Sequence, residues 1–379
     1  MDENYTILIA AGGTGGHIFP AIALARKYEK DGHKVIIVGT GKKIEQKIFS
    51  TEDFEIKYLK SNFKDSSIYK KLFLSFKTDQ EIKSYVREAK PDLILGMGGY
   101  ASAELCFARE RDTCVIIHEQ NSIAGRVNRL LLLFRANAAI QGLPGSFSWL
   151  DRLFMTFSDD LVFLGNPIRK QILNIRRDPD RSDNPKELRV FIMGGSQGAR
   201  SINHVAPEAL SKVNKAINIE VIHDAGEHDY SEVNAAYRKF KLNAKVTKFN
   251  PNIESAYEWA DLFIGRAGAM TVSELSAIGL PSILIPYPHA MDNHQFHNAK
   301  FLGDKGGAII IEDKDLNPEK LAGEVIALYT NKRTLEKMSQ AALDSHFFDA
   351  TNNITEFSYR IIKKYKLMRS LAKFDTGGT

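Results

Sequence analysis

The chain has 379 residues, of which 44% are hydrophobic and 26% charged, and its formal net charge is +5. The length allows two domains that each bury a full core, and the composition excludes disordered, collagen-like and polytopic membrane chains. The charge is too small to indicate a nucleic-acid-binding protein, and two cysteines, Cys106 and Cys114, exclude a disulfide framework or a cysteine-rich metal site.

The N-terminal segment, MDENYTILIAAGG, differs from a secretory signal peptide. It is acidic and has only a short apolar run, whereas a signal peptide has a basic start and a longer apolar core. The longest apolar runs further on, such as 130–134, fall far short of the roughly 20 residues that span a bilayer. We therefore expect a cytosolic or peripherally membrane-bound protein in a reducing compartment.

Apolar, β-branched strands alternate with helical patterns along almost the whole chain. In the first half the expected strands are 5–11, 34–40, 92–97 and 114–119, with a helix around Ala21 to Asp31. In the second half they are 189–195, 220–226, 261–266 and 282–288. Buried strands separated by helices predict an α/β fold with parallel sheets covered on both faces.

The two halves of the sequence also repeat each other. YTILIAAGGTGGH recurs as LRVFIMGGSQGAR, and PDLILGMGGYAS recurs in the same order as ADLFIGRAGAMT. We interpret this as two similar doubly wound domains. The segment 165–187 is rich in Pro, Asp, Asn and Arg and lacks strand patterning, so it predicts a linker between domains at 1–164 and 188–346.

The last segment, from about Phe347, has the pattern of a basic amphipathic helix. Apolar residues fall near one face and basic residues surround them: Phe357, Ile361, Ile362, Tyr365 and Met368, with Arg360, Lys363, Lys364 and Lys366. We expect residues 347–379 to pack back on the first domain. A role at a membrane surface is the alternative.

Glycine-rich loops follow the first strand of each half. Glycine permits positive φ and close backbone approach, so amides at the following helix N-terminus can face an anion or a polar ligand. Ile18 stands where the dinucleotide fingerprint needs its third glycine, and no Gly-Lys-Ser or Gly-Lys-Thr run forms a Walker A loop. The second loop, 194–200, adds a hydroxyl and a positive charge and favours a diphosphate. A tight turn with structural glycines is the alternative for either loop.

Polar residues follow several later strands, at the sheet edge where open parallel sheets bind ligands. Glu274, soon after the strand 261–266, could accept both hydroxyls of a ribose diol or merely favour a helix dipole, and its spacing leaves both open. The stretches 118–121 and 289–298 combine amides, imidazoles and carboxylates that suit sugar hydroxyls. Their histidine spacing completes no metal-ligand set, so we expect no metal.

With these loops and strand ends in view, the sequence resembles the MurG family of glycosyltransferase family 28. The resemblance covers nearly the full length and rests on AGGTGGHIFPAIALA, LGMGGYAS, HEQNSIAGRVNRLL, GNPIR, GGSQGAR, RAGAMTVSELSAIGLP and HQFHNA. These enzymes transfer GlcNAc with inversion from UDP-GlcNAc to the 4-hydroxyl of MurNAc in undecaprenyl-diphospho-MurNAc-pentapeptide, forming lipid II in bacterial peptidoglycan synthesis. The resemblance implies a GT-B fold, with two Rossmann-like doubly wound parallel-sheet domains facing across a cleft.

The resemblance also implies the partners and the place of action. The partners are UDP-GlcNAc, the polyprenyl-diphosphate-linked muramyl-pentapeptide and an anionic membrane surface, with no cofactor and no nucleic acid. The protein is then expected at the cytoplasmic face of the bacterial cell membrane. Two stretches depart from the family pattern: GGYASAEL lacks a common glycine-proline, and HDAG replaces the usual His-Gln before its glycine.

By the same resemblance, the second half holds the donor. Ser196 and Gln197 would meet the diphosphate, Glu274 the ribose diol, and the backbone of Asn250 the uracil. The remaining expected donor contacts come from both halves: Thr14, Gly15, Gly16, Asn121, Arg169, Ala269, Met270, Thr271, Val272, Ser273, His294 and Gln295. Among these, Gln295, His294 and Asn121 would bind GlcNAc hydroxyls, and the loop 14–17 would face the acceptor and the reacting carbon.

The candidate general base is His17. The acceptor hydroxyl must lose a proton as it attacks the anomeric carbon, and imidazole titrates near neutral pH. The alternative is a structural histidine whose ring hydrogen-bonds the backbone of the glycine loop. The helix N-terminus behind 194–198 would stabilise the departing diphosphate without a metal.

Because the acceptor is a lipid, we also expect the first domain to contact the membrane. The stretch 66–77 places an apolar stripe among lysines: Ile68, Leu72, Phe73 and Phe76, with Lys70, Lys71 and Lys77. This pattern predicts an interfacial helix. A core-facing stripe with a solvated basic rim is the alternative.

Three other functions compete with this interpretation. A UDP-GlcNAc 2-epimerase-like isomerase also uses two facing Rossmann-like domains but needs no lipid. A non-catalytic UDP-sugar-binding module is disfavoured by the intact His17 loop in the same chain. Another glycolipid-forming transferase of the same superfamily remains open.

Overall fold

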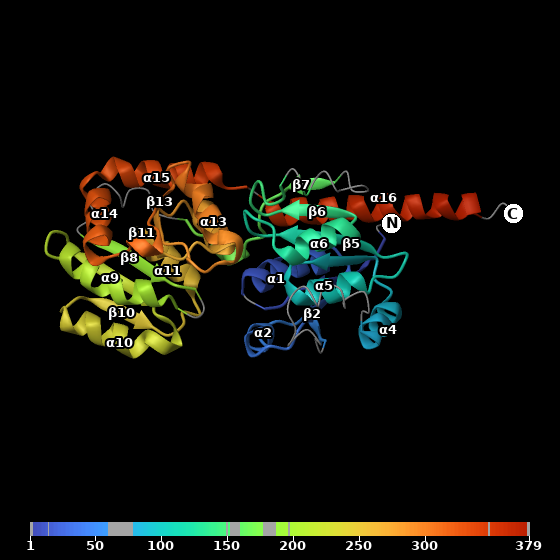
Figure 1. The fold of residues 1–379 in the computed structure, drawn as a ribbon, viewed down its shortest axis with the longest axis horizontal. Helices are drawn as coiled ribbons and strands as arrows, with labels where there is room; N and C mark the ends of the chain where they lie inside the picture. Colours follow the sequence, from blue (N-terminus) through green and yellow to red (C-terminus); the bar gives the residue numbers. More distant parts are fainter. Residues whose placement is uncertain are drawn as a thin grey trace. The chain divides into compact units, whose positions relative to one another are not determined.

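The chain divides into two compact units. A computed structural model describes residues 3–13, 15–59, 79–148, 151, 160–176, 187–195, 198–347 and 349–376. The first unit comprises Met1–Arg169 and Phe347–Thr379, and the second comprises Lys170–His346 (Figure 1). The break after Arg169 lies within the segment 165–187 for which the sequence predicts a linker.

The first unit contains a parallel sheet with strand order β3-β2-β1-β4-β5-β6-β7. The strands are β1 (Thr6–Ala10), β2 (Lys34–Gly39), β3 (Glu55–Tyr58), β4 (Leu93–Gly96), β5 (Cys114–Glu119), β6 (Ala138–Gln141) and β7 (Leu161–Phe163). The strand order reverses between β1 and β4. At such a reversal the loops after the two strands diverge and leave a ligand crevice at the carboxyl ends.

Helices cover both faces of this sheet (Figure 1). The helices are α1 (Gly15–Lys30), α2 (Lys43–Phe49), α4 (Gln80–Ala89), α5 (Gly99–Phe107), α6 (Arg126–Phe134) and α16 (Ala350–Thr376). Apolar residues of α1 and α16 share one core with β1, β4 and β5. Residues of α4, α5 and α6 form a second core with the opposite sides of the same strands, as expected for a sheet buried on both faces.

Helix α1 begins at Gly15, earlier than the helix predicted around Ala21 to Asp31. Pro20 lies inside the helix. Proline fixes φ near the helical value, so it is tolerated here although it gives up one backbone hydrogen bond. The earlier start places His17 in the first turn, directly beside the glycine loop.

The second unit repeats this architecture, with strand order β10-β9-β8-β11-β12-β13, all parallel. Its strands are β8 (Leu188–Met193), β9 (Ile219–Asp224), β10 (Ala244–Thr247), β11 (Leu262–Gly265), β12 (Ser282–Leu284) and β13 (Ala308–Ile310). Its helices are α8 (Lys170–Leu173), α9 (Arg200–Val213), α10 (Gly226–Lys239), α11 (Ile253–Trp259), α12 (Ala269–Ile278), η3 (Met291–Asn293), α13 (His294–Gly303), η4 (Asp313–Asp315), α14 (Pro318–Thr330) and α15 (Lys332–Ser345).

The internal repeat in the sequence corresponds to equivalent strands of the two sheets. The first repeated pair forms β1 and β8, and the second forms β4 and β11, which are the strands on either side of each reversal. The predicted pair of doubly wound parallel-sheet domains is confirmed. The sequence did not predict β3, β6, β7, β10 and β13, which are short and lie at or next to the sheet edges.

Helix α16 packs on the first unit, where polar contacts anchor it. Tyr28 Oη donates to Ser358 Oγ at 2.8 Å, and Tyr359 Oη donates to Asp31 Oδ2 at 2.8 Å. Phe357, Ile361 and Ile362 are buried. The predicted apolar face is wrong at its end, because Met368 is 50% exposed. The end of α16 runs beyond the other elements of the first unit (Figure 1).

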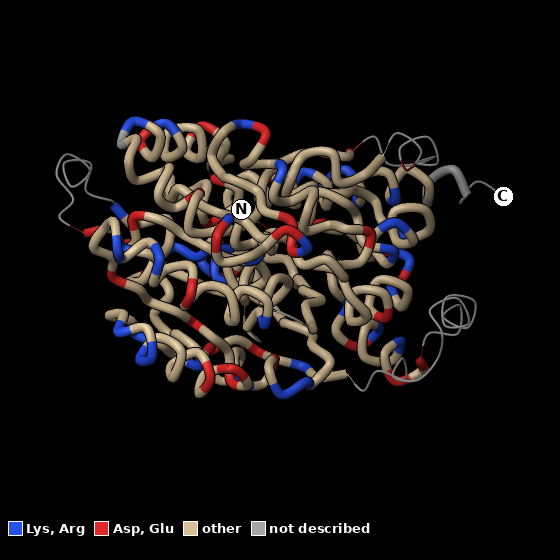
Figure 2. The backbone as a smooth tube through the Cα atoms, turned by 60° about the vertical axis from the view of Figure 1, so that its left-hand side comes forward, with Lys and Arg blue, Asp and Glu red and all other residues tan. Residues whose placement is uncertain are grey.

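Positions of Lys and Arg are interspersed with positions of Asp and Glu along the backbone (Figure 2). This distribution agrees with the small net charge. Within the described ranges, no helix combines the length and apolarity needed to cross a bilayer.

Candidate functional site

In the first unit, His17 lies against the loop that follows β1. Its Nδ1 is 3.1 Å from the carbonyl oxygen of Gly12. A carbonyl only accepts hydrogen bonds, so in the neutral ring Nδ1 carries the proton and Nε2 carries the lone pair. The contact expected of a structural histidine is therefore present, yet it leaves Nε2 in the form that accepts a proton.

The loop after β4 packs against the other side of the His17 ring. A Cβ added at Gly98 would lie 3.1 Å from His17 Nε2, and one at Gly99 would lie 3.7 Å from Nδ1. Both glycines have positive φ, +98° and +74°, which a side chain would strain. The two loops at the sheet reversal, after β1 and β4, thus enclose His17.

Glu119, at the end of β5, organises the neighbouring loop that carries Asn121. Its Oε1 accepts from both the backbone and side-chain nitrogens of Asn121 at 3.0 Å, and its Oε2 accepts from Gly125 N and Asn128 Nδ2 at 2.9 Å. The side-chain nitrogen of Asn121 is therefore held by Glu119. A carboxylate with this many donors is a rigid support rather than a proton carrier.

His118 is a buried neutral histidine in the same strand. Its Nε2 donates to the carbonyl of Gly165 and its Nδ1 accepts from Gln120 Nε2, both at 3.1 Å. Burial lowers the pKa of His118 to about 4. Both ring nitrogens are thus satisfied without a charge, which excludes His118 as a ready proton acceptor at neutral pH.

This lowered pKa predicts acid sensitivity of folding. An unfolded histidine titrates near 6.5, so between about pH 6.5 and 4 the unfolded state binds more protons, and stability falls as the pH falls. We expect a loss of about 2 kcal/mol from His118 between pH 7 and pH 5, measured by urea unfolding. His118→Gln should weaken this pH dependence and the exposed-site control His289→Gln should not. An unaltered dependence in His118→Gln would contradict the assignment.

In the second unit, the loop after β8 approaches a neighbouring loop too closely for side chains. A Cβ at Gly198 would lie 2.2 Å from the carbonyl oxygen of Ala225, in the loop that follows β9. Glycine is therefore required at Gly198 by packing as well as by its φ of +79°. Ser196 and Gln197, the expected diphosphate contacts, lie outside the described residues, as does Thr14 in the first unit.

Helix α12 carries the expected nucleotide contacts at its start. Ala269 and Met270 open the helix, where the first backbone amides have no partner within the helix. Thr271, Val272 and Ser273 follow in the first turns, and Val272 and Ser273 are buried. The amides of Ala269 and Met270 are thus available to a ligand at the carboxyl edge of β11.

Glu274 is 5% exposed and accepts a hydrogen bond from Tyr257 Oη at 3.1 Å through Oε2. It is the sixth residue of α12, whose first turn holds no acidic residue. Because dipole effects fall off within the first turn of a helix, the helix-dipole alternative explains this residue poorly. A carboxylate has about four acceptor sites, so it can accept from several donors at once.

Arg266 is a functional candidate that the sequence reasoning missed. Its Nη1 lies 2.6 Å from Asp313 Oδ1 and also donates to the carbonyls of Ile285 and Pro286, while Nη2 donates to Ser201 Oγ at 2.9 Å. Arg266 is buried and Asp313 partly buried, and the pair joins the loops after β11 and β12 to the start of α9. The feature of the sequence that could have indicated this role is an arginine directly after β11, but the partners of Arg266 are distant in sequence.

The remaining expected contacts of the second unit lie on loops and at a helix start. The carboxylate of Asp224, whose pKa is raised by burial, accepts a hydrogen bond from the backbone amide of Asn250. His294 Nδ1 donates to the carbonyl of Met291 at 2.8 Å, and Gln295 Oε1 accepts from Tyr287 N at 2.9 Å. In the first unit, Arg169 places its guanidinium 4.5 Å from the Phe19 ring.

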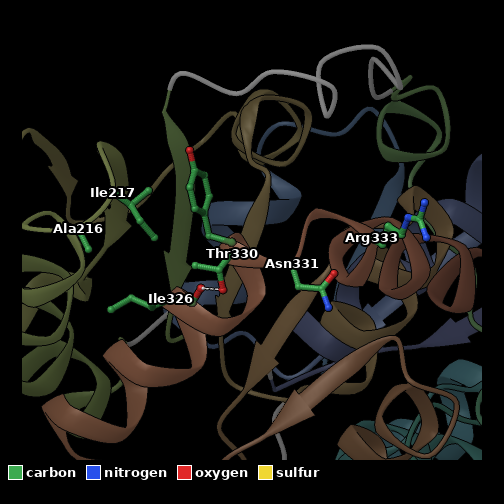
Figure 3. Close-up of a pocket in the computed structure, with 7 residues that line it drawn as sticks. Ala216, Ile217, Ile326, Thr330, Asn331 and Arg333 are labelled. Atoms are coloured by element: carbon green, nitrogen blue, oxygen red, sulfur yellow. Dashed lines mark hydrogen bonds between the residues drawn. The ribbon is translucent and has the colours of Figure 1, made fainter.

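A cavity in the second unit lies away from these loops. Its volume is about 590 Å³, and its lining includes Ile217, Tyr329 and Arg333 (Figure 3). Ile217 lies two residues before β9, so the cavity is at the amino end of the sheet, whereas the glycine loops follow the carboxyl ends. The cavity contains none of the expected site residues.

Two further expectations concern metal and membrane contacts. Across the described ranges, no cluster of three or more His, Cys, Asp or Glu side chains is arranged to hold a metal ion. The expected membrane stretch lies outside the described residues: Ile68, Lys70, Lys71, Leu72, Phe73, Phe76 and Lys77.

Comparisons with known proteins cover both units. The glycosyltransferase family 28 N-terminal domain matches residues 7–140, and the family 28 C-terminal domain matches residues 189–354. A UDP-N-acetylglucosamine–N-acetylmuramyl-(pentapeptide) pyrophosphoryl-undecaprenol N-acetylglucosamine transferase of Shewanella woodyi is 35% identical over 371 residues, which are 96% of this chain and 99% of that protein.

Solved structures are similar to the chain as well. The crystal structure of Acinetobacter baumannii MurG has a TM-score of 0.74 and 29% identity, and the match covers 93% of this chain and 98% of that chain. A Listeria monocytogenes protein provisionally described as a UDP-N-acetylglucosamine 2-epimerase has a TM-score of 0.67 at 13% identity, covering 93% of this chain and 95% of that chain. The second likeness concerns the fold alone. Together with the two parallel-sheet units, these matches confirm the GT-B fold class.

Proposed function

The chain belongs to glycosyltransferase family 28, and from this membership we infer that it transfers GlcNAc from UDP-GlcNAc to the muramyl 4-hydroxyl of undecaprenyl-diphospho-MurNAc-pentapeptide. It is an N-acetylglucosaminyltransferase that converts lipid I to lipid II in peptidoglycan synthesis. The observation that carries this function is the match over 96% of the chain to a transferase of that name. The epimerase alternative is supported only by a likeness of fold.

We propose that the second unit binds the donor. The amides of Ala269 and Met270 at the start of α12 support a contact to the base or phosphate edge, and buried Glu274 supports contacts to the ribose hydroxyls. The backbone of Asn250, whose amide donates to Asp224, is proposed to contact uracil. The other donor contacts stay as the sequence predicts them: Asn121, Arg169, Ser196, Gln197, His294 and Gln295 with Gly15, Gly16 and Thr14 of the first loop.

The proposed reaction is a single inverting displacement. The muramyl 4-oxygen bonds to the anomeric carbon, the bond from that carbon to the UDP oxygen breaks, and the hydroxyl proton passes to Nε2 of His17. The tautomer fixed by Gly12 supports this role, because Nε2 carries the lone pair. Charge that develops on the leaving diphosphate is stabilised by main-chain amides at helix N-termini of the second unit. Transfer therefore requires both units.

One experiment separates the competing functions. Purified protein is incubated with UDP-GlcNAc, with and without a muramyl-pentapeptide lipid analogue, and UDP release and product mass are measured. The proposed function requires UDP release that depends on the acceptor and a product heavier by one GlcNAc. A new UDP-sugar formed without acceptor would indicate an isomerase, and binding without turnover would indicate a binding module.

The membrane contact is a separate proposal, because the lipid acceptor must be reached at the cytoplasmic face of the cell membrane. The apolar and lysine pattern of 66–77 supports an interfacial helix that binds anionic lipid. We expect wild-type protein to sediment with vesicles containing anionic lipid and the double variant Leu72→Glu, Phe73→Glu to remain mostly in the supernatant. Undiminished sedimentation of the folded double variant would reject this contact.

A further inference from the structure

Glu45 of α2 is a fully buried carboxylate that no step of the proposed reaction uses. Both of its oxygens are saturated with donors from two loops. Oε1 accepts from Gly13 N and Thr40 Oγ1 at 2.7 Å, and Oε2 accepts from Thr40 N at 2.7 Å and Gly41 N at 2.8 Å. Four donors on a buried carboxyl group match an ionised side chain that only accepts.

The surrounding backbone is shaped to admit this carboxylate. A Cβ on Gly39 would lie 2.9 Å from Oε2, and a Cβ on Gly12 would lie 3.1 Å from Oε1. In the described part of the chain, Glu45 forms no ion pair with a lysine, arginine or histidine, so backbone amides provide most of its stabilisation. The carboxylate thus lies among backbone amides of two loops, which favour a negative charge.

One peptide group connects Glu45 with His17. The N–H of Gly13 donates to Glu45 Oε1 at 2.7 Å, and the carbonyl of Gly12 lies 3.1 Å from His17 Nδ1. These two groups belong to the same peptide bond, which is planar, so fixing one end fixes the other. A hydrogen bond to a charged acceptor also polarises the peptide and strengthens the bond at its carbonyl.

We propose that Glu45 is a positioning residue that holds His17 in its Nδ1-protonated form through the Gly12–Gly13 peptide. This inference rests on the proposed function only for its effect on turnover. The first glycine loop is then a support for the histidine, and its Gly13 amide is unavailable to the diphosphate of the acceptor. Without Glu45 the peptide is free to rotate about Gly13, whose φ is +98°, and His17 loses its acceptor.

The substitution Glu45→Gln removes the hydrogen bond from Gly13 and keeps the other contacts of the side chain. The amide oxygen can still accept from the backbone amides of Thr40 and Gly41. Its NH₂ group can donate to the Thr40 hydroxyl, which can turn to accept, but it cannot accept from Gly13. The matched control is Thr40→Val, which removes one donor to the same carboxylate and leaves the Gly13 contact in place.

Nitrogen-15 NMR of the histidine rings in the full chain tests the inference directly. The His17 signals are identified as those missing from a His17→Gln variant. We expect wild type and Thr40→Val to show protonated Nδ1 and bare Nε2, and Glu45→Gln to show a mixture of tautomers. An Nε2-protonated His17 in wild type would overturn the inference without any variant, as would an unchanged tautomer in folded Glu45→Gln. If Glu45→Gln does not fold, the wild-type tautomer decides.

Kinetics provide the second readout. We expect Glu45→Gln to lower kcat about 10- to 100-fold, by analogy with loss of the group that orients a metal-ligating histidine, with the KM for UDP-GlcNAc within about twofold. A general loss of folding would also lower the apparent kcat and leave KM unchanged, but it would lower the thermal midpoint and the folded fraction, so kcat is calculated per folded molecule. If Glu45→Gln changes the tautomer but His17→Ala keeps full turnover, the coupling stands and the proposed base role fails. If His17 is essential for turnover but its tautomer is the same in Glu45→Gln as in wild type, only the proposed coupling is wrong.

Discussion

Replacement of His17 by alanine is expected to lower turnover by about two to four decades, the range for loss of a general base. The physical reason is that Nε2 is left as the proton acceptor when Nδ1 donates to Gly12. The affinity for UDP-GlcNAc should change little, because the proposed contacts to the uracil, the ribose and the donor diphosphate lie mainly in the second unit and none is assigned to His17. UDP release in the presence of acceptor measures turnover, and calorimetric titration with UDP measures binding.

His17→Asn distinguishes the chemical role from the structural one. The asparagine amide can donate to the Gly12 carbonyl as Nδ1 does, but it cannot accept a proton at neutral pH. We expect His17→Asn to be nearly as inactive as His17→Ala while its thermal midpoint stays closer to that of wild type. An asparagine variant with wild-type turnover would assign His17 to support of the loop and remove it from the mechanism.

Glu274→Ala is expected to weaken UDP binding about 100-fold. Two ribose hydroxyls that donate to one carboxylate contribute about 1.5 kcal/mol each as hydrogen bonds to a charged acceptor, and the sum corresponds to roughly this factor. Burial of Glu274 beside Tyr257 keeps the carboxylate in one position for this purpose. Calorimetric titration of UDP into wild type and variant measures the change.

Binding of a deoxyribose nucleotide shows whether the loss of affinity comes from the contact between Glu274 and the ribose. We expect 2′-deoxy-UDP to bind wild type more weakly than UDP, and the two ligands to bind Glu274→Ala almost equally. Tyr257→Phe is the control, since it removes the hydrogen bond from Tyr257 Oη to Glu274 and keeps the carboxylate. If Glu274→Ala retained wild-type affinity and lost only a few tenths of a kcal/mol of stability, the helix-dipole interpretation would be correct after all.

Much of this structure could be predicted from local sequence patterns. The strands at the centre of each sheet are apolar on both faces, so β1, β4, β8 and β11 were recognisable without any partner. The glycine loops after them were recognisable because a short connection from a strand to a helix needs residues that adopt positive φ or allow close approach of the backbone. The edge strands, such as β3 and β10, were not, because their exposed residues carry no apolar run.

The sequence by itself thus determined the paired parallel sheets and the loops at their carboxyl edges, since strand burial and glycine conformation are properties of short segments. Tertiary structure alone decided which polar groups support those loops. Glu45 reaches Gly13 across 32 residues, and Arg266 reaches Asp313 across 47. No short-range period encodes such contacts, because they arise only when the loops of separate strands converge at one sheet edge.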